Sequence, residues 1–405
     1  MPVTPRIETQ AQSTLSPRRG FKRIVEIANI PLMIVMIVLV SFGLLVVWSA
    51  TQGSEKYSFS HQLSGVFIGL AFMLLIWRLD YRRFALLTVP LLILDIVLVL
   101  MPHMPVIGVT INGASSWVSL FGFQFQPGEL AKIVTILFLA ALVSKYRGRL
   151  DSGKEYLKVV GVLLVLLLGI MSQPDMGTGL VFVAIGAAIL FSGGANRKWL
   201  LITILVIFIV LVVAFLADPL LDQAIGHDVF LKEYQKNRLL VFLNEDLDPS
   251  GVSYNLKQAK IAIGSGGLIG KGFNNATQSG LGFLPEAPTD FVFCVLAEEF
   301  GFVGSVGLLT LYGLLFYVVF RIALRTVDPF GSLVIMGIVG MWAFQILQNI
   351  GMTCGLMPIT GIPLPFISYG SSFMLANFIA LGLILSVWTN GSGKVSRQHL
   401  NIKDA

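Results

Sequence analysis

Long apolar runs dominate this sequence and restrict what it can fold into. Runs such as 32–49, 199–217 and 331–354 approach or exceed the length of about 20 residues that a helix needs to cross a hydrocarbon core of about 30 Å. Of the 405 residues, 55% are hydrophobic and 12% are charged, whereas soluble domains average about 25% charged residues. The mean hydropathy is +0.83. The sequence therefore predicts an all-α polytopic membrane protein.

Polar breaks divide the chain into about ten predicted transmembrane helices. They are expected near residues 32–49, 61–77, 84–101, 129–144, 156–172, 177–192, 199–217, 291–320, 331–355 and 368–388. We expect a disordered tail at 1–31, a membrane domain at 32–388 and a second tail at 389–405. Basic residues precede the first run and no small-residue cleavage site follows it, so the run is predicted to be an uncleaved signal anchor.

The basic residues mark one side of the predicted helices. Most of them fall on alternate connections and on the two tails, for example at Arg82, Lys145, Arg321, Arg325 and Lys394. Because positively charged loops stay in the cytoplasm, both termini are predicted to be cytoplasmic. The net charge of +6 then reflects topology and not nucleic-acid binding.

A long polar segment at residues 218–290 lies between the seventh and eighth predicted helices, on the extracytoplasmic side. It contains a helix-like run at 233–243, a turn-rich run at 244–251 and a glycine cluster at 264–267. Loops of this length are usually functional or disordered. We interpret this large extracytoplasmic loop as the working surface. Its presence disfavours the symmetry of an inverted-repeat transporter.

Cysteine and histidine give no sign of a metal centre. The two cysteines, Cys294 and Cys354, fall inside apolar runs, which argues against a disulfide framework or a thiolate site. The four histidines are far apart and lack the spacing of metal-binding motifs. No metal site is predicted.

Charged residues within or beside the predicted helices are candidate functional residues, because a charge in lipid is costly. They are Asp95, Glu129, Lys132, Asp175, Asp290, Glu298 and Glu299. Glu129 and Lys132 share one helical face and can form an ion pair, which is either structural or ligand-facing. Asp175 is either a helix N-cap or a site residue. At least one of Glu298 and Glu299 is expected to face a protein interior or a wet cavity.

Asp290 stands where the extracytoplasmic loop enters the eighth predicted helix. A carboxylate at the boundary of lipid and water can be partly desolvated, which raises its pKa and makes it a better base. The alternative is that Asp290 is the N-cap of that helix. The residues alone leave both interpretations open.

Several longer motifs resemble a known family. They are NGA at 112–114 with Trp117, FQPGELAK at 125–132, QPD at 173–175, QAKIAIGSGG at 258–267, GKG at 270–272, LPEAPTDF at 284–291, NIGM at 349–352 and TGIPLPFISYG at 360–370. From the first predicted helix to about residue 388, the chain resembles the SEDS family (shape, elongation, division and sporulation), and its RodA members more than its FtsW members.

The resemblance implies a bundle of about ten membrane helices that polymerises lipid II into glycan strands for cell-wall elongation. Asp290 corresponds to the family's proposed catalytic base, and Glu129, Lys132 and Asp175 correspond to its other motif residues. The implied location is the bacterial cell membrane. The implied partners are lipid II, a class B penicillin-binding protein and the membrane proteins of the elongation complex.

Four positions depart from the family pattern. Serines at 115 and 116 replace basic residues before the tryptophan, Gly128 replaces serine, Pro288 replaces histidine and Ser371 replaces glycine. The serines put a pyrophosphate contact at that position in question, and the missing histidine weakens the idea of a histidine that assists Asp290.

The pyrophosphate leaving group needs positive charge. Candidates on the predicted outer side are Lys132, Arg238, Lys257, Lys260 and Lys271, although loop lysines are more often merely solvated. No stably bound cofactor is expected, and Mg²⁺ or Mn²⁺ is the alternative source of charge. Two other functions stay open: a flippase for lipid II, and a non-catalytic scaffold for a transpeptidase. An FtsW-like role in division is the alternative within the family.

Overall fold

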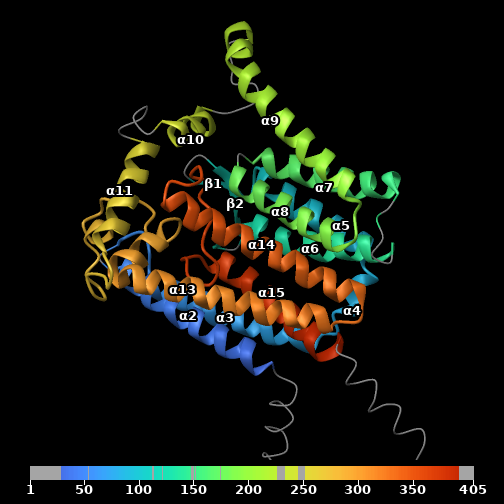
Figure 1. Ribbon diagram of the computed structural model, residues 1–405, viewed down its shortest axis with the longest axis horizontal. Coiled ribbons are helices and arrows are strands. Elements are labelled where there is room, and N and C mark those ends of the chain that lie inside the picture. Colours follow the sequence, from blue (N-terminus) through green and yellow to red (C-terminus); the bar gives the residue numbers. More distant parts are fainter. Residues whose placement is uncertain are drawn as a thin grey trace, which may run out of the picture.

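The computed structural model of the chain is a bundle of long, roughly aligned helices (Figure 1). It describes residues 29–52, 54–111, 114–120, 122–146, 150, 152–173, 175–225, 233–244 and 251–391. Most of the predicted tails, the predicted turn at 245–250 and the asparagine and glycine of the NGA motif lie outside the described residues. Predictions about them stay predictions.

Every predicted span corresponds to a helix. The helices are α2 (Ile30–Ala50), α3 (Phe59–Arg78), α5 (Thr88–Leu100), α6 (Pro127–Ser144), α7 (Gly153–Met171), α8 (Met176–Ser192), α9 (Arg197–Ile225), α13 (Val292–Arg325), α14 (Pro329–Thr353) and α15 (Ser371–Gly391). Short helices α4 (Arg82–Ala85) and η1 (Met101–His103) flank α5. Within the described residues, six helices are long and apolar enough to cross a membrane, and two shorter ones are apolar. The helical, multi-pass architecture is confirmed.

Local sequence signals set where helices begin. The Asn29 side chain accepts a hydrogen bond of 3.1 Å from the Leu32 N–H at the start of α2. Pro31 occupies the first turn, where its missing N–H costs nothing. Asp328 caps α14 in the same way through the Gly331 N–H, at 3.2 Å. These caps satisfy N–H groups that the helix itself leaves unpaired.

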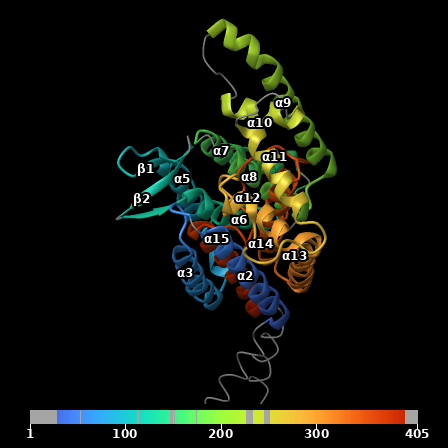
Figure 2. The same cartoon turned by 90° about the vertical axis from the view of Figure 1, so that its left-hand side faces the viewer.

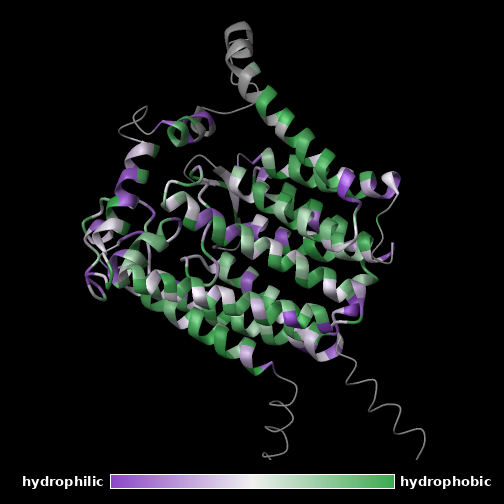
Figure 3. Cartoon of the chain, viewed as in Figure 1, coloured by the Kyte–Doolittle hydropathy of each residue, from purple (hydrophilic) through white to green (hydrophobic). Residues whose placement is uncertain are grey.

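Burial separates inner helices from outer ones. The apolar windows of α6, α14 and α15 are 83%, 67% and 72% buried, whereas those of α3 and α13 are each 28% buried. Helix α14 packs on α6 and α8, and α15 packs on α3. Hydrophobic residues cover the length of the outer helices (Figure 3), as expected where lipid is the solvent.

A small antiparallel sheet follows η1, and the sequence analysis did not anticipate it. Strands β1 (Gly108–Ile111), β2 (Ala114–Leu120) and β3 (Phe123–Phe125) pair in the order β1-β2-β3, with Val118 opposite both Gly108 and Phe125. The hairpin projects from the side of the bundle (Figure 2). The longest strand, β2, reads ASSWVSL; its adjacent serines and its adjacent Trp117 and Val118 break the alternation of polar and apolar residues that marks a strand.

Helix α9 extends beyond the span predicted at 199–217. It continues to Ile225, and the start of the extracytoplasmic loop at residue 218 stays a prediction. The prediction followed the fall in hydropathy, but helical hydrogen bonding does not stop where lipid contact stops. Helix α10 (Glu233–Leu243) coincides with the predicted helix-like run, and α11 (Val252–Ser265) and α12 (Thr277–Gly280) follow.

The helix directions place the connections on two ends of the bundle. We call the end that carries α10 to α12 and residues 281–291 the loop end. We call the end where α2 begins and α15 finishes the tail end (Figure 1). Asp175, Glu129 and Asp290 all lie at or beside helix starts at the loop end.

Candidate active site

Asp290 sits in a tight turn directly before α13. Its N–H and that of Thr289 donate to the Glu286 carbonyl oxygen, at 3.1 and 3.2 Å. The Asn349 side-chain amide, from α14, donates to the carbonyl oxygens of both Asp290 (2.9 Å) and Ile362 (2.7 Å). One buried asparagine therefore joins the turn to the connection between α14 and α15.

Glycine is required beside the Asp290 carboxylate. Gly361 has φ of +72°, and a Cβ atom there would lie 3.0 Å from Asp290 Oδ2. The positive φ disfavours other residues, and a methyl group at this position would press on the Asp290 carboxylate. The family-like run at 360–370 thus shapes the surroundings of Asp290.

A second set of contacts fixes the same turn. The Ser368 hydroxyl donates to the Thr289 carbonyl oxygen at 2.7 Å and accepts from the Leu364 N–H at 2.7 Å. The Tyr369 N–H donates to the Pro288 carbonyl oxygen at 2.9 Å. The LPEAPTDF and TGIPLPFISYG motifs, far apart in sequence, form one interlocked structure.

Asp290 is not the N-cap of α13. The capping residue is Phe291, and no side chain caps the helix start. This alternative from the sequence is therefore wrong: the turn places the carboxylate away from the first free N–H groups. The interpretation of Asp290 as a base stays a prediction.

The surroundings of Asp290 favour a base that works near neutral pH. Burial raises the pKa of this carboxyl from 3.8 to about 6; Glu286 and Asp175 raise it as well, and Arg238 lowers it. The structure thus brings Asp175 and Arg238, of α10, within electrostatic range of Asp290. A carboxylate tuned in this way is typical of catalytic groups.

Asp175 caps α8 and contacts α6. Its Oδ1 accepts from the Thr178 N–H at 2.9 Å, and its Oδ2 accepts from the Gln126 side chain at 3.1 Å. A Cβ at Gly177 would lie 2.8 Å from the Thr360 carbonyl oxygen. The N-cap interpretation is confirmed, and the cap also holds the starts of α6 and α8 against the 360–362 segment.

Glu129 and Lys132 form the predicted ion pair. Lys132 Nζ lies 2.7 Å from Glu129 Oε2, with side chains only 2% and 5% exposed, and Lys132 Nζ lies 5.7 Å from the centre of the Phe373 ring. Pro127 starts α6 just before the pair, where the helix dipole favours the carboxylate. The structure shows the pair itself, and a role in substrate binding stays a prediction.

Two of the predicted cations are engaged away from Asp290. Lys271 Nζ lies 2.5 Å from Glu298 Oε1 and donates to the Thr277 hydroxyl at 2.8 Å. Lys260, on α11, lies against the turn after α14, since a Cβ at Gly355 would be 2.8 Å from its Nζ. The predicted role of both lysines with pyrophosphate stays a prediction.

Glu298 and Glu299 are both buried in the protein interior, which agrees with the prediction that at least one of them faces a protein interior or a wet cavity. Both lie on α13 where the loop packs. Glu298 accepts from the N–H groups of Thr277 (2.9 Å) and Gln278 (3.3 Å), and Glu299 accepts from the Ser49 hydroxyl. Helix α13 kinks at Gly301, with φ of 64°. The kink exposes backbone groups that pair with the loop, including the Lys271 N–H to the Glu298 carbonyl oxygen at 3.0 Å.

Glu286 was missed as a functional candidate although it lies in the quoted LPEAPTDF motif. Its carboxylate accepts from Lys56 Nζ and the Tyr57 hydroxyl, both from the connection between α2 and α3. The Tyr57 ring meets the Tyr369 ring edge-on at 5.1 Å. Glu286 therefore links the Asp290 turn to α2 and α3, a contact that no local sequence pattern could predict.

The departures from the family pattern have local explanations. The Ser115 hydroxyl pairs with that of Thr110 at 2.9 Å within the sheet. Pro288 offers its carbonyl oxygen to Tyr369, as described above, and Gly128 packs against Thr178. Ser371 lies where a Cβ on Gly65 would contact it at 2.9 Å. None of these residues contributes a charge to the Asp290 surroundings.

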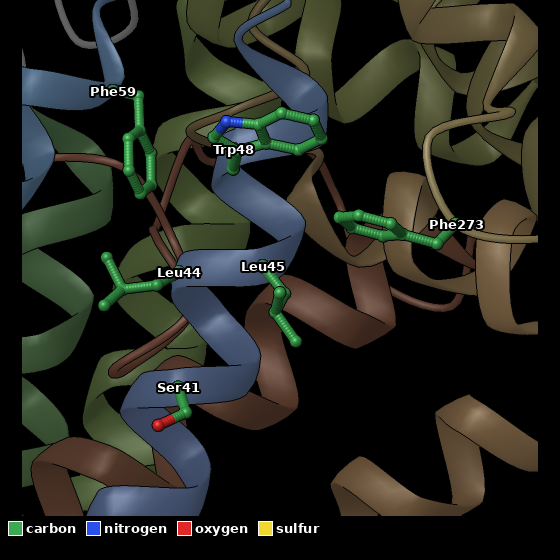
Figure 4. A pocket seen from close by; sticks show the side chains of 6 residues that line it. All are labelled: Ser41, Leu44, Leu45, Trp48, Phe59 and Phe273. Atoms are coloured by element: carbon green, nitrogen blue, oxygen red, sulfur yellow. The ribbon is translucent and has the colours of Figure 1, made fainter.

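An apolar groove of about 550 Å³ opens at the loop end. It is lined by Ser41, Leu44, Leu45 and Trp48 of α2, Phe59 of α3 and Phe273 of the loop. The Trp48 and Phe273 rings stack with centres 5.5 Å apart, and Figure 4 shows them beside the leucines of α2. Phe59 follows closely on Lys56 and Tyr57, which hold Glu286, so the groove lies beside the support of the Asp290 turn.

The described residues contain no cluster of three His, Cys, Asp or Glu side chains that could hold a metal ion.

The family model described as "Cell cycle protein", which covers FtsW, RodA and SpoVE, matches residues 29–392. The chain is 36% identical over 363 residues to the Escherichia coli peptidoglycan glycosyltransferase MrdB, covering 89% of this chain and 93% of that protein. It is 32% identical to a probable peptidoglycan glycosyltransferase FtsW of Trichlorobacter lovleyi, covering 89% and 92%. It is 34% identical to stage V sporulation protein E of Bacillus subtilis, covering 88% and 95%.

Solved structures show the same fold. One is described as "Structural coordination of polymerization and crosslinking by a peptidoglycan synthase complex"; it aligns with a TM-score of 0.73 and 32% identity, covering 89% of this chain and 97% of that one. The Thermus thermophilus rod shape determining protein RodA aligns with a TM-score of 0.64 and 28% identity, covering 89% and 96%. These matches extend over nearly the whole membrane domain.

Proposed function

This chain belongs to the SEDS family of peptidoglycan glycosyltransferases, and from that premise we propose that it polymerises lipid II for cell-wall elongation with Asp290 as general base. The relatives of this chain include proteins named FtsW, MrdB and stage V sporulation protein E. The elongation role is supported by the sequence motifs, which resemble those of RodA members of the family more than those of FtsW members.

In the proposed reaction, the Asp290 carboxylate takes the proton from the 4-hydroxyl of the acceptor GlcNAc. That oxygen attacks the anomeric carbon of the donor MurNAc, the bond to the undecaprenyl pyrophosphate breaks, and the configuration at that carbon inverts. Asp290 ends protonated, and the pyrophosphate leaves with the bonding electrons. General-base catalysis typically contributes about 10²- to 10⁴-fold.

One observation carries the assignment: a partly buried carboxyl, held by backbone contacts from separate segments, whose pKa lies near 6. At pH 7 most molecules then carry the base in its ionised form, and the raised pKa strengthens it as a proton acceptor. A carboxylate that only capped a helix would be expected to contact the helix N–H groups.

The leaving pyrophosphate requires nearby positive charge in this scheme. Arg238 is the predicted cation that acts electrostatically on Asp290, so we favour it as the residue that contacts the pyrophosphate. Lys132 is the second choice because it sits at the adjacent start of α6. Mg²⁺ or Mn²⁺ bound through the pyrophosphate would supply further charge.

The apolar groove beside α2 supports binding of a polyprenyl tail. It is open on one side, it is lined almost wholly by hydrocarbon and aromatic side chains, and it lies at the same end of the bundle as Asp290. We propose that one undecaprenyl chain of lipid II occupies it.

We further propose that the protein lies in the bacterial cell membrane with both termini in the cytoplasm. Its proposed partner is a class B penicillin-binding protein.

The test is polymerisation of fluorescent lipid II by purified wild type and Asp290→Asn, each with a cognate transpeptidase and Mg²⁺ or Mn²⁺. We expect long strands from the wild type and a loss of about 10²-fold or more from the variant. Asp328→Asn is the matched control, because asparagine caps a helix as well as aspartate does and Asp328 lies at the tail end.

Equal activity of the wild type and Asp290→Asn would remove Asp290 from the mechanism. No product from either protein, together with transfer of labelled lipid II across a vesicle membrane, would favour the flippase interpretation instead.

A further inference from the structure

A cavity at the tail end carries a second kind of binding surface. It measures about 300 Å³ and is bounded by the start of α2, the last turns of α13 and the end of α15. Its lining includes Asn29, Tyr317, Arg321, Arg325 and Trp388. We propose that this cavity binds the phosphate headgroup of an anionic phospholipid from the adjacent leaflet.

The charges of the cavity favour an anion. Among the described residues, the polar and ring interactions of Arg321 are with the Tyr317 hydroxyl (3.3 Å) and ring (5.7 Å to its centre), and both arginines are exposed. Within the described part of the chain, no carboxylate forms an ion pair with either arginine. The nearby Asp328 is directed instead to the Gly331 N–H. Two guanidinium groups therefore line the cavity without an ion-pair partner among the residues that the structure describes.

A neighbouring arginine shows what a structurally engaged cation looks like at this end. Arg82 donates to the Asn390 carbonyl oxygen at 2.9 Å and lies over the Tyr81 ring. It fastens α4 to the end of α15. Arg321 and Arg325 make no comparable hydrogen bond to the backbone within the described residues. A role as cytoplasmic topology signals alone would not require these two arginines to line a cavity.

The rest of the cavity matches a lipid and not a soluble anion. Ile30, Val318 and Ile322 also line it, and Ile30 is 47% exposed, which provides an apolar surface for acyl chains. Tyr and Trp are enriched where headgroups meet hydrocarbon, and basic pockets between helices suit anionic headgroups. The start of α2 also adds the positive end of a helix dipole.

The experiment is native mass spectrometry of the purified full-length chain, incubated with palmitoyl-oleoyl phosphatidylglycerol or with the matching phosphatidylcholine. We expect specific retention of phosphatidylglycerol by the wild type. The Arg321→Gln/Arg325→Gln double variant should bind it about fivefold more weakly per arginine, or roughly 25-fold in total. Excess inorganic phosphate should leave the bound lipid in place.

The matched control is Arg197→Gln/Lys198→Gln, which removes two exposed charges from the start of α9, away from the cavity. Unchanged retention in the control supports the site. Equal retention in both double variants, equal retention of the two lipids, or displacement of the lipid by phosphate alone would each overturn the proposal.

Discussion

Asp290 and Glu298 lie on either side of the start of α13, and their surroundings differ. Glu298 has a side chain that is 0% exposed and is paired with Lys271 at 2.5 Å; it also receives N–H groups from Thr277 and Gln278. Asp290 is partly exposed. The hydrogen bonds from Asn349 and Ser368 go to backbone carbonyl oxygens of its turn and not to its carboxylate. One carboxylate is committed to holding the loop, and the other is left available for a substrate.

The difference shows how a membrane protein can use acidic residues at one boundary for two purposes. A buried carboxylate is tolerated when its charge and hydrogen-bonding capacity are satisfied. A partly desolvated carboxylate with fewer hydrogen-bond and charge partners keeps a raised pKa and stays reactive. The comparison predicts that changes at Glu298 act on stability and that changes at Asp290 act on rate.

The largest expected effect on stability follows from Glu298→Gln. The change leaves Lys271 without its charge partner and turns an amide group toward the Thr277 and Gln278 N–H groups, which should cost about 3 kcal/mol of unfolding free energy. Thermal or denaturant unfolding in detergent would measure it.

Glu299→Gln is the control for this prediction, because Glu299 accepts from Ser49 and forms no ion pair among the described residues. A loss of stability at Glu299 as large as that at Glu298 would contradict the role assigned to the Lys271 pair.

The Glu129–Lys132 pair decides between a structural and a ligand-facing role. Glu129→Gln leaves a buried lysine unpaired and should lower both stability and activity. Glu129→Gln/Lys132→Met removes both charges, which should restore much of the stability because the unpaired buried charge is gone. If the pair faces substrate, the double variant should stay about 100-fold less active in lipid II polymerisation. Recovery of activity along with stability would identify the pair as purely structural.

Gly361→Ala should act on Asp290 through space. The new methyl group would press on Asp290 Oδ2 at 3.0 Å and would strain a backbone with φ of +72°, so we expect about a tenfold lower turnover from the displaced base. Gly264→Ala is the control, since a Cβ there meets nothing within 4 Å. Equal turnover of the two variants would show that the position of the carboxylate is not critical.

The smallest effect concerns Glu286, whose charge helps to raise the pKa of Asp290. Glu286→Gln removes that repulsion, so the pKa of Asp290 should fall and the acid limb of the rate profile should move to lower pH. A shift of about half a unit would raise the ionised fraction about threefold at pH 5. Tyr57→Phe, which removes a hydrogen bond to Glu286 but no charge, should leave the midpoint in place. A midpoint unmoved in Glu286→Gln would contradict the coupling.

Much of the fold could be predicted from the sequence, because a long apolar run that crosses a membrane must form a helix to satisfy its backbone hydrogen bonds. The predicted spans, the run at 233–243 and the Glu129–Lys132 pair depend on neighbours close in sequence, and the structure contains them. The sheet at 108–125 was missed because β2 does not alternate polar and apolar residues. The end of α9 was missed because hydropathy does not report where helical hydrogen bonding ends.

The site was only partly predictable, for a different reason. Asp290 and Asp175 could be named from their positions beside helices, but their proximity depends on contacts between distant segments. Asn349, Gly361 and Ser368 surround the Asp290 turn, and Lys56 and Tyr57 reach it through Glu286. No local pattern specifies such pairings, although the family-like motifs marked most of the segments that make them.

The most direct test of the account is the pH dependence of lipid II polymerisation by the wild type under single-turnover conditions. Since a base acts only when ionised and the pKa of Asp290 is raised to about 6, the rate should rise about tenfold per pH unit below that value and level off above it. A residual rate in Asp290→Asn should lack this rise. A wild-type rate that stays flat between about pH 5 and 7, or a variant that keeps the same rise, would contradict Asp290 as the general base.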